Sequence, residues 1–204
     1  MKGIIHFTRV NGDMALMERL KIPSLVIRIG LAVGIIIIGI VIWTNVMARW
    51  GNGSPPAPYP ADQQADLIVV NKAARHLVLM RQGRVIGSYA VSLGAGADQG
   101  AKRREGDKKT PEGRYLIDGR NPHSRFYLSL HISYPDLNDL QRGKAGGYKP
   151  GENIMIHGVP NGWGWFSAIF SHFDWTDGCI AVSNADMQQI WARVPTGVAI
   201  TIAP

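Results

Sequence analysis

Cys179 is the only cysteine among the 204 residues of the chain, and it follows the sequence Trp175-Thr176-Asp177-Gly178 and precedes an apolar run. One thiol cannot form an internal disulfide, so its placement calls for another role. A thiol between a glycine and a hydrophobic run, with a histidine held elsewhere in the fold, is typical of a cysteine nucleophile and its base. The alternative is a small buried apolar residue, because free cysteines are often buried.

The base that this thiol requires is predicted to be His157. It ends the apolar run Asn153-Ile154-Met155-Ile156 and is followed by Gly158, so a strand end next to a glycine would mount it rigidly. An imidazole that accepts the thiol proton increases the thiolate population and can later return the proton to a leaving amine. His172, seven residues before Cys179, is the rival among the six histidines.

The residues around the thiol suggest how the reaction would be supported. Gly178 leaves the backbone uncrowded, so the Cys179 N–H and a neighbouring amide are candidates for stabilising an oxyanion. The Thr176 hydroxyl would bond either His157 or the substrate, or it would simply cap the loop. Asp177 can orient an imidazole or accept backbone hydrogen bonds.

An uncharged stretch of 20 residues, Ile29–Ala48, precedes this chemistry. At about 1.5 Å per helical residue it would span about 30 Å, the thickness of a bilayer core. Basic residues dominate the segment before it, which by the positive-inside rule leaves the N-terminus in the cytoplasm and exports the remainder. We therefore predict a cytoplasmic segment 1–28 and a single transmembrane signal anchor 29–48. A cleavable signal peptide, cut near Met47-Ala48, is the alternative.

The segment 49–65 is rich in proline and glycine and is predicted to be an extracytoplasmic linker, with one domain at 66–204. As an extended helix its last 15 residues would reach up to about 45 Å from the membrane. Of the formal charge of +7, only +3 belongs to residues 51–204. This weak charge, without a basic stripe, argues against nucleic-acid binding.

The domain is predicted to be mainly β, an antiparallel sandwich or barrel with one or two packed helices. Apolar runs separated by turn residues predict the strands; they cover 67–70, 76–80, 85–93, 114–117, 126–133, 153–157 and 198–202. The one convincing helix is 184–193, with Ser183 or Asn184 as its cap and Met187, Ile190 and Trp191 on one face.

Several ordered motifs resemble the L,D-transpeptidase catalytic domain, the YkuD-type family of bacterial cell-wall enzymes. They are Val91-Ser92-Leu93-Gly94, the segment Gly106–Tyr115, Arg120-Asn121-Pro122, the segment Ser129–Pro135, the His157-Gly158 strand end and the segment Thr176–Asn184. The resemblance runs from about Asp66 to the C-terminus. It implies the L,D-transpeptidase fold for this part of the chain.

The resemblance also implies a reaction. Such enzymes attack the diaminopimelate carbonyl of a peptidoglycan tetrapeptide, release the terminal D-alanine and hold the acyl group as a cysteine thioester. An amine acceptor or water then takes it. The nucleophile corresponds to Cys179 and the general base to His157, and no metal or other cofactor is implied. The partners would be peptidoglycan stem peptides and, through the N-terminal helix, the bacterial inner membrane, with the catalytic domain in the periplasm.

Two positions depart from the commoner family pattern Ser-His-Gly-Cys-Ile-Arg, where this chain has Asp177 and Ala181. Ala181 removes a guanidinium that could meet a substrate carboxylate. Arg120, Arg125 and Lys149 are candidates to supply that charge, and the alternative is that each is an ordinary surface cation. With Arg120, the candidate substrate contacts are Tyr134, Trp165 and Trp175.

Six aromatic residues lie within Trp163–Trp175, between the predicted base and the nucleophile. This aromatic segment would form either a lid that excludes water from the thioester or part of the core. Two further hypotheses belong to other classes. One is a zinc site drawn from His157, His172, Asp174 and Cys179, although no close ligand pair supports it; the other is a non-catalytic wall-binding domain. The oligomeric state is not indicated by the sequence.

Overall fold

The structure is a computed structural model that describes residues 24–204, so residues 1–23 of the predicted cytoplasmic segment lie outside the described residues. Residues Ser24–Trp50 form one α-helix of 27 residues, α1. Its best window has a mean hydropathy of 2.9, and none of that window is buried. By length and composition α1 can cross a membrane, and it contains the whole of the predicted span.

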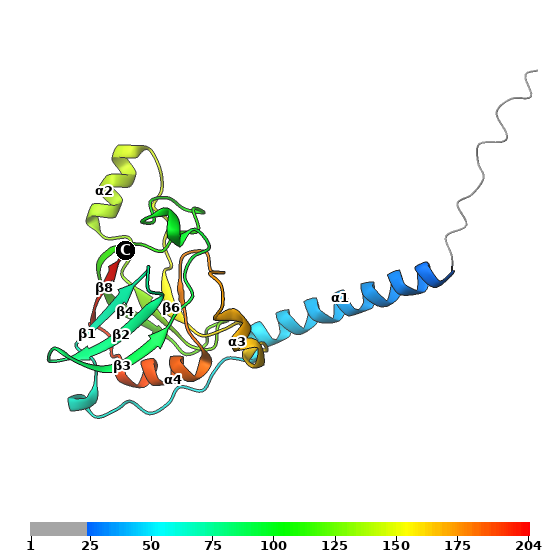
Figure 1. Ribbon diagram of the computed structural model, residues 1–204, viewed down its shortest axis with the longest axis horizontal. Coiled ribbons are helices and arrows are strands. Elements are labelled where there is room, and N and C mark those ends of the chain that lie inside the picture. Colours follow the sequence, from blue (N-terminus) through cyan, green and yellow to red (C-terminus); the bar gives the residue numbers. More distant parts are fainter. Residues whose placement is uncertain (1–23) are drawn as a thin grey trace, which may run out of the picture. The chain divides into compact units, whose positions relative to one another are not determined.

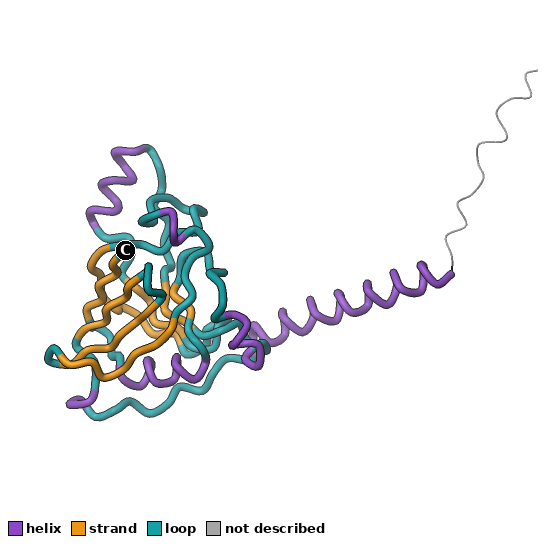
Figure 2. The backbone as a smooth tube through the Cα atoms, viewed as in Figure 1, coloured by secondary structure: helices purple, strands orange, loops and turns teal. Residues whose placement is uncertain are grey.

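The domain is built on one eight-stranded sheet with the order β3-β2-β1-β8-β4-β5-β6-β7. The strands are β1 (Leu67–Asn71), β2 (His76–Arg81), β3 (Arg84–Ala90), β4 (Gly113–Asn121), β5 (Ser129–Ile132), β6 (Met155–His157), β7 (Ile180–Ala181) and β8 (Ala199–Ala203). Pairing is antiparallel except between β1 and β8 and between β6 and β7. The sheet curls, with the helices outside it (Figure 2). The prediction of a mainly β, largely antiparallel fold is confirmed.

Alternation along the strands builds the core. In β1 and β8 every second side chain is buried, which places Ile68, Val70, Ile200 and Ile202 on the inner face. Successive side chains of a strand point to opposite faces, so one face of these strands is fully covered while the other is only half-buried or exposed. Burying each such side chain contributes about 1.5–3 kcal/mol.

Beyond α1, one short helical element precedes β1 and the others lie between strands (Figure 1). They are η1 (Ala61–Gln63), η2 (Ala97–Gln99), α2 (Leu137–Gly146), η3 (Gly164–Phe166), α3 (Ser167–Phe170) and α4 (Asn184–Arg193). The predicted helix at 184–193 is α4, and its apolar face supplies buried Met187, Ile190 and Trp191 to the core.

Helix α2 was not predicted because its apolar pattern is weak. It is defined instead by its ends. Asp136 accepts a hydrogen bond from the Asp139 N–H while the Asp139 side chain accepts one from the Asp136 N–H, which makes a capping box. Gly147 ends the helix in the left-handed conformation, with φ of 69°.

The proline-rich linker is not the freely extended tether that its composition suggested. The Gly53 N–H donates to the Tyr127 carbonyl at 2.9 Å, and the Tyr59 N–H donates to the Ala192 carbonyl at 2.8 Å. The Arg193 guanidinium lies 4.5 Å from the centre of the Tyr59 ring. The linker is therefore docked along the domain, and the reach of about 45 Å expected for an extended helix is corrected.

Ser183 is the N-cap of α4, since its hydroxyl accepts a hydrogen bond from the Asp186 N–H at 3.1 Å. We expect Ser183→Ala to lower the free energy of unfolding by about 1 kcal/mol, because one N-terminal amide loses its partner. Urea denaturation followed by circular dichroism measures this difference. Ser54→Ala, at an exposed linker serine, is the control and should have no effect; equal stability of the two variants would contradict the capping role.

Candidate active site

The parallel pairing of β6 with β7 brings the predicted base and nucleophile together. His157 is opposite Ala181, and Ile156 is opposite Ile180. This register places Cys179, the residue before β7, opposite Met155, two positions before His157. Because side chains two positions apart share one face of a strand, the thiol and the imidazole lie on the same face. His157 and Cys179, which are 22 residues apart in the sequence, thus lie on neighbouring strands.

Both side chains line one cavity of about 290 Å³. Its walls are largely aromatic and apolar, with Phe126, Trp175 and Met155 beside His157 and Cys179. A second cavity of about 530 Å³ also has Cys179 in its wall, and its rim is charged, with Lys102, Glu105 and Lys108 among the lining residues. The thiol therefore faces two adjoining spaces of different polarity.

His157 is 4% exposed and is held by its backbone and by rings. Its Nδ1 lies 2.6 Å from the Gly158 carbonyl oxygen. Since a carbonyl can only accept, Nδ1 carries the proton and Nε2 is left with a free lone pair. The Phe126 ring packs 4.6 Å from the imidazole, and the Trp175 ring meets it edge-on at 5.8 Å. Burial lowers the pKa of His157 to about 4.

The thiol of Cys179 is also in an environment that disfavours charge. Burial raises its pKa, and the negative charge of Asp177 raises it further, whereas a hydrogen bond from the Met155 N–H and the charge of Lys102 lower it. Its Sγ lies 3.6 Å from the Asn153 carbonyl oxygen, to which the S–H can donate. Because the pKa of Cys179 is raised and that of His157 is lowered, both groups are uncharged at neutral pH: a thiol and a neutral imidazole.

The turn before the thiol is closed by the Thr176 hydroxyl. It donates to the Cys179 carbonyl at 2.7 Å and accepts from the Gly178 N–H at 3.2 Å. Of the roles predicted for Thr176, the structure shows the loop cap. The Gly178 amide is consequently occupied, while the Cys179 N–H makes no hydrogen bond to any group within residues 24–204. The Cys179 amide is thus the one left for an oxyanion.

Two glycines are required by the space around them. Gly178 has φ of 128°, and a Cβ there would lie 2.6 Å from the Lys109 carbonyl oxygen. At Gly158 a Cβ would lie 2.4 Å from the Asn184 side-chain oxygen. Real Cβ atoms do not make contacts this short. Gly158 and Gly178, both predicted as site residues, are therefore needed because they let neighbouring groups approach the backbone closely.

Of the other predicted site residues, some line the cavity of His157 and Cys179 and others lie away from it. Trp175 and Asp177 line the cavity with the reacting pair. Trp165 is 77% exposed and belongs to neither of the cavities at Cys179. The Tyr134 hydroxyl is buried and donates to the Pro150 carbonyl at 3.0 Å, so Tyr134 supports a loop and does not line the site.

Arg120, the leading candidate for the missing charge, is held elsewhere. Its guanidinium stacks 4.2 Å from the centre of the Trp191 ring and donates to the Trp191 carbonyl at 2.8 Å. It therefore fastens β4 to α4 and contributes no charge to the cavities at Cys179. The cations that do line the larger cavity are Lys102 and Lys108.

Asn153 is the site residue that sequence reasoning missed. It lines both cavities and presents its carbonyl to the thiol. Its φ of 63° lies in the left-handed region, which asparagine tolerates better than most residues. An asparagine just before an apolar strand was a signal of such a turn, but only the fold shows that the turn faces Cys179.

The residues considered for zinc do not converge. The Asp174 carboxylate bonds Arg75 and the Leu93 N–H. His172 lines a different cavity, together with Arg75 and Asp174. Within residues 24–204, no three histidine, cysteine or acidic side chains form a metal-binding group.

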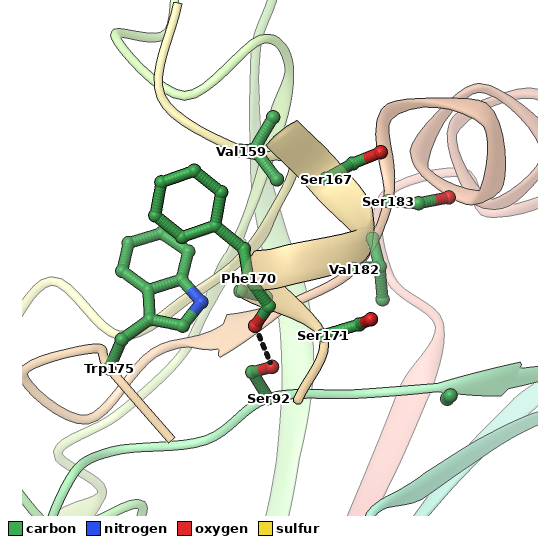
Figure 3. Close-up of a pocket in the computed structure, with 10 residues that line it drawn as sticks. Ser92, Val159, Ser167, Phe170, Ser171, Trp175, Val182 and Ser183 are labelled. Atoms are coloured by element: carbon green, nitrogen blue, oxygen red, sulfur yellow. Dashed lines mark hydrogen bonds between the residues drawn. The ribbon is translucent and has the colours of Figure 1, made fainter. Parts of the chain in front are cut away.

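The aromatic segment Trp163–Trp175 has an inner and an outer side. Inside, the Phe170 and Trp175 rings lie 5.1 Å apart, and the Ser92 hydroxyl donates to the Phe170 carbonyl at 2.8 Å (Figure 3). Outside, Trp165 and Phe173 are at least half exposed. The inner rings pack against one another beside the cavity, whereas Trp165 and Phe173 line neither of the cavities at Cys179. A lid over the thioester stays a prediction.

Comparison with known proteins gives concordant results. Residues 65–202 match the family model of the L,D-transpeptidase catalytic domain, YkuD. YafK from Escherichia coli (strain K12) is 35% identical over 79 residues, which make up 38% of this chain and 30% of YafK. The crystal structure of the helical cell shape determining protein Pgp2 from Campylobacter jejuni has a similar fold, with a TM-score of 0.51 and 24% identity over 79% of this chain and 54% of that chain. The chain spans less than two thirds of either relative.

The buried imidazole predicts a pH dependence of stability. The folded pKa of His157 is about 4, below the unfolded value of about 6.5. Between these pH values the unfolded chain binds a proton that the folded chain does not, so this contribution to stability is lost as the pH falls, by about 3 kcal/mol in all. In His157→Gln that loss should be absent. Urea denaturation between about pH 7 and pH 4 measures it, with His123→Gln at an exposed histidine as control. Parallel stability curves for wild type and His157→Gln would refute the neutral buried imidazole.

The charge of Asp177 predicts a change in thiol reactivity. Asp177→Asn removes a carboxylate that raises the pKa of Cys179, so at a fixed mildly alkaline pH iodoacetamide should alkylate the thiol about two- to threefold faster. Cys179 is the only thiol, so intact mass reports it directly. Asp62→Asn, on the exposed η1, should leave the rate unchanged; an equal rate in Asp177→Asn would show that its charge does not act on the thiol.

Proposed function

Because the chain belongs to the L,D-transpeptidase catalytic domain family, YkuD, we propose that it is a peptidoglycan L,D-transpeptidase with Cys179 as nucleophile and His157 as general base and acid. The observation that carries this proposal is the common cavity in which the thiol meets a neutral imidazole. The family implies a cysteine-dependent enzyme that modifies peptidoglycan. The specific reaction is our proposal.

In the acylation step, the Cys179 sulfur attacks the diaminopimelate carbonyl that is bonded to the terminal D-alanine of a tetrapeptide. The thiol proton passes to Nε2 of His157, and the carbonyl electrons move onto its oxygen. When the tetrahedral intermediate collapses, the C–N bond breaks, the imidazolium protonates the departing D-alanine amine, and a thioester remains. Loss of a single oxyanion donor typically costs about 10²–10³ in rate, and the free Cys179 N–H suits that role.

The second step returns the acyl group to an amine. The acceptor amine attacks the thioester carbonyl, His157 takes its proton, and the C–S bond breaks to regenerate the thiol. Two spaces that meet at Cys179 support binding of two stem peptides at once, one in the aromatic cavity and one in the charged cavity. Phe126 and Trp175 exclude water from the first, which favours an amine over hydrolysis.

The charge expected from the missing family arginine is proposed to come from the larger cavity. Lys108 lines it, with Asp177, Glu105 and Glu152 as acidic neighbours. Lys102 also lines it, but its ammonium is paired with Asp107 at 2.9 Å. Groups of both signs suit an acceptor that carries an ammonium and a carboxylate, as the free end of diaminopimelate does. Asp177 would then act on the substrate amine and not on the imidazole.

A hydrolase that sends the same thioester to water, as an L,D-carboxypeptidase or a peptidoglycan amidase, is the alternative within the same chemistry. It is supported by the partly open charged cavity, through which water can reach the sulfur. A non-catalytic wall-binding domain is less well supported, since it would not require a neutral thiol and a neutral imidazole on one face of the sheet.

The N-terminal helix supports an assignment to the inner membrane. We propose that α1 is a retained single-pass anchor, with the N-terminus in the cytoplasm and the catalytic domain in the periplasm. The sequence before the apolar stretch carries five basic residues, Lys2, Arg9, Arg19, Lys21 and Arg28, whereas the last turn of α1 carries only Arg49, and this excess suits that orientation. Cleavage after export, which would free the domain, is the alternative.

The purified full chain in detergent, incubated with disaccharide-tetrapeptides, tests the reaction. We expect loss of alanine with formation of cross-linked dimers, detected by mass spectrometry, and Cys179→Ala should abolish both because no thioester can form. His157→Ala should reduce the rate at least about 10²-fold. His131→Ala, on β5 outside the lining of both cavities, is the control.

The products decide between the proposals. Loss of alanine or stem cleavage without any dimer would show a hydrolase. The wall-binding domain would be favoured by two results together: the wild-type protein leaves the substrate unchanged, and wild type and Cys179→Ala bind peptidoglycan equally well. These results would overturn the enzymatic assignment.

A further inference from the structure

The outer side of the aromatic segment carries an exposed apolar face made of Trp165, Ile169 and Phe173. Their exposed fractions are 77%, 53% and 50%. Trp165 and Ile169 are four residues apart along η3 and α3, which places them on the same side of the helical turns. An exposed tryptophan with a second exposed apolar side chain one helical turn away, and a third exposed apolar residue in the same segment, is unusual for a surface that faces only water.

The point at which the chain leaves α1 lies close to the active-site wall. Only two residues, Gly51 and Asn52, separate Trp50, the last residue of α1, from Gly53. The Gly53 N–H bonds the Tyr127 carbonyl at 2.9 Å, and the Asn52 side chain donates to the Pro122 carbonyl at 3.1 Å. Three residue steps span at most about 11 Å, so the surface around Tyr127 stays close to the end of α1 however that helix is oriented.

The same surface leads directly to the apolar face. The buried Asn161 side chain accepts the Tyr127 N–H at 2.7 Å, and the Asn161 N–H donates to the Arg125 carbonyl at 3.0 Å. One residue further, the Gly162 carbonyl accepts a hydrogen bond from Trp165 Nε1 at 3.3 Å. A series of hydrogen bonds thus connects the docked linker to the beginning of the aromatic segment.

From this continuity we propose that the apolar face rests on the lipid surface of the membrane in which α1 is anchored. The inference rests on the membrane anchor of the proposed function. Tryptophan prefers the membrane–water interface, where its ring is apolar and its N–H is wet, and isoleucine and phenylalanine enter the acyl boundary. Arg125 is exposed beside this surface, where a cation is attracted to anionic headgroups.

The contact would link the membrane to the catalytic cavity. The inner side of the same segment supplies Trp175, which walls the cavity of Cys179 and His157, and Phe170, which packs on Trp175. A segment held between the bilayer and the sheet keeps these rings in place. The enzyme then acts on stem peptides that lie next to the membrane, and not on those at the far side of the wall.

Tryptophan quenching by brominated lipid tests this contact in the full chain. The protein is reconstituted into vesicles of phosphatidylethanolamine and phosphatidylglycerol, with and without bromine on the acyl chains, and flotation confirms that it is anchored. Trp43, Trp50 and Trp165 would be quenched, so Trp165→Phe should reduce the bromine-dependent loss of emission by about a third. Trp191→Phe, at a buried residue, is the control and should leave that loss unchanged.

The possible results distinguish the lipid contact, the membrane anchor and the catalytic proposal from one another. If flotation is retained and Trp165→Phe leaves the quenching unchanged, the apolar face lies away from the lipid and the inference is wrong, while the catalytic proposal is unaffected. If flotation is lost, the anchor and this inference both fail, but the tetrapeptide assay still stands. A shift of Trp165 emission on adding peptidoglycan fragments, without quenching by brominated lipid, would assign the face to the wall and overturn lipid contact.

Discussion

The candidate active site depends on the parallel pairing of two very short strands, β6 and β7. β7 has only two residues, yet it is held on both sides: the Val182 N–H donates to the His157 carbonyl, and Ala181 exchanges two backbone hydrogen bonds with Ser92. This pairing sets the register that places the thiol and the imidazole on one face. A shift by one residue would turn Cys179 to the opposite face of the sheet and separate it from its base.

The burial that positions His157 also sets its basicity. An imidazole with a pKa of about 4 takes little of the proton from a thiol whose own pKa is raised, so the resting pair stays uncharged. In the proposed reaction, its basicity would increase when a substrate carbonyl becomes an oxyanion beside it, because a negative charge in a poorly solvated cavity strongly favours an imidazolium. The proposed stabilisation of the oxyanion by the imidazolium is then largest in the transition state and small in the ground state. This difference is the condition for increasing the catalytic rate.

Features set by local sequence could be predicted, and those set by long-range packing could not. Helix α4 and the first hairpins follow from periodicity and turn residues. The choice of Cys179 and His157 as a pair rested on their types, their flanking glycines and the family resemblance, and the fold places both in one cavity. The turn at Asn153 and the position of Arg120 depend on which segments meet in space. The linker shows the same limit. Proline and glycine favour an extended chain, but hydrogen bonds to Tyr127 and Ala192 dock it on the domain, and composition does not reveal such partners.

The departures from the family pattern fall where the structure accommodates them. Asp177 is exposed and lines both cavities, so its side chain changes the charge there without disturbing the backbone. Ala181 is 3% exposed, and only about 20 Å³ of free space remains beside it, under Phe170 and Trp175. A guanidinium at this position would displace those rings. The rings therefore occupy the space that a long cation at position 181 would need, which is consistent with the proposal that the charge for the substrate comes from the cavity lined by Lys108.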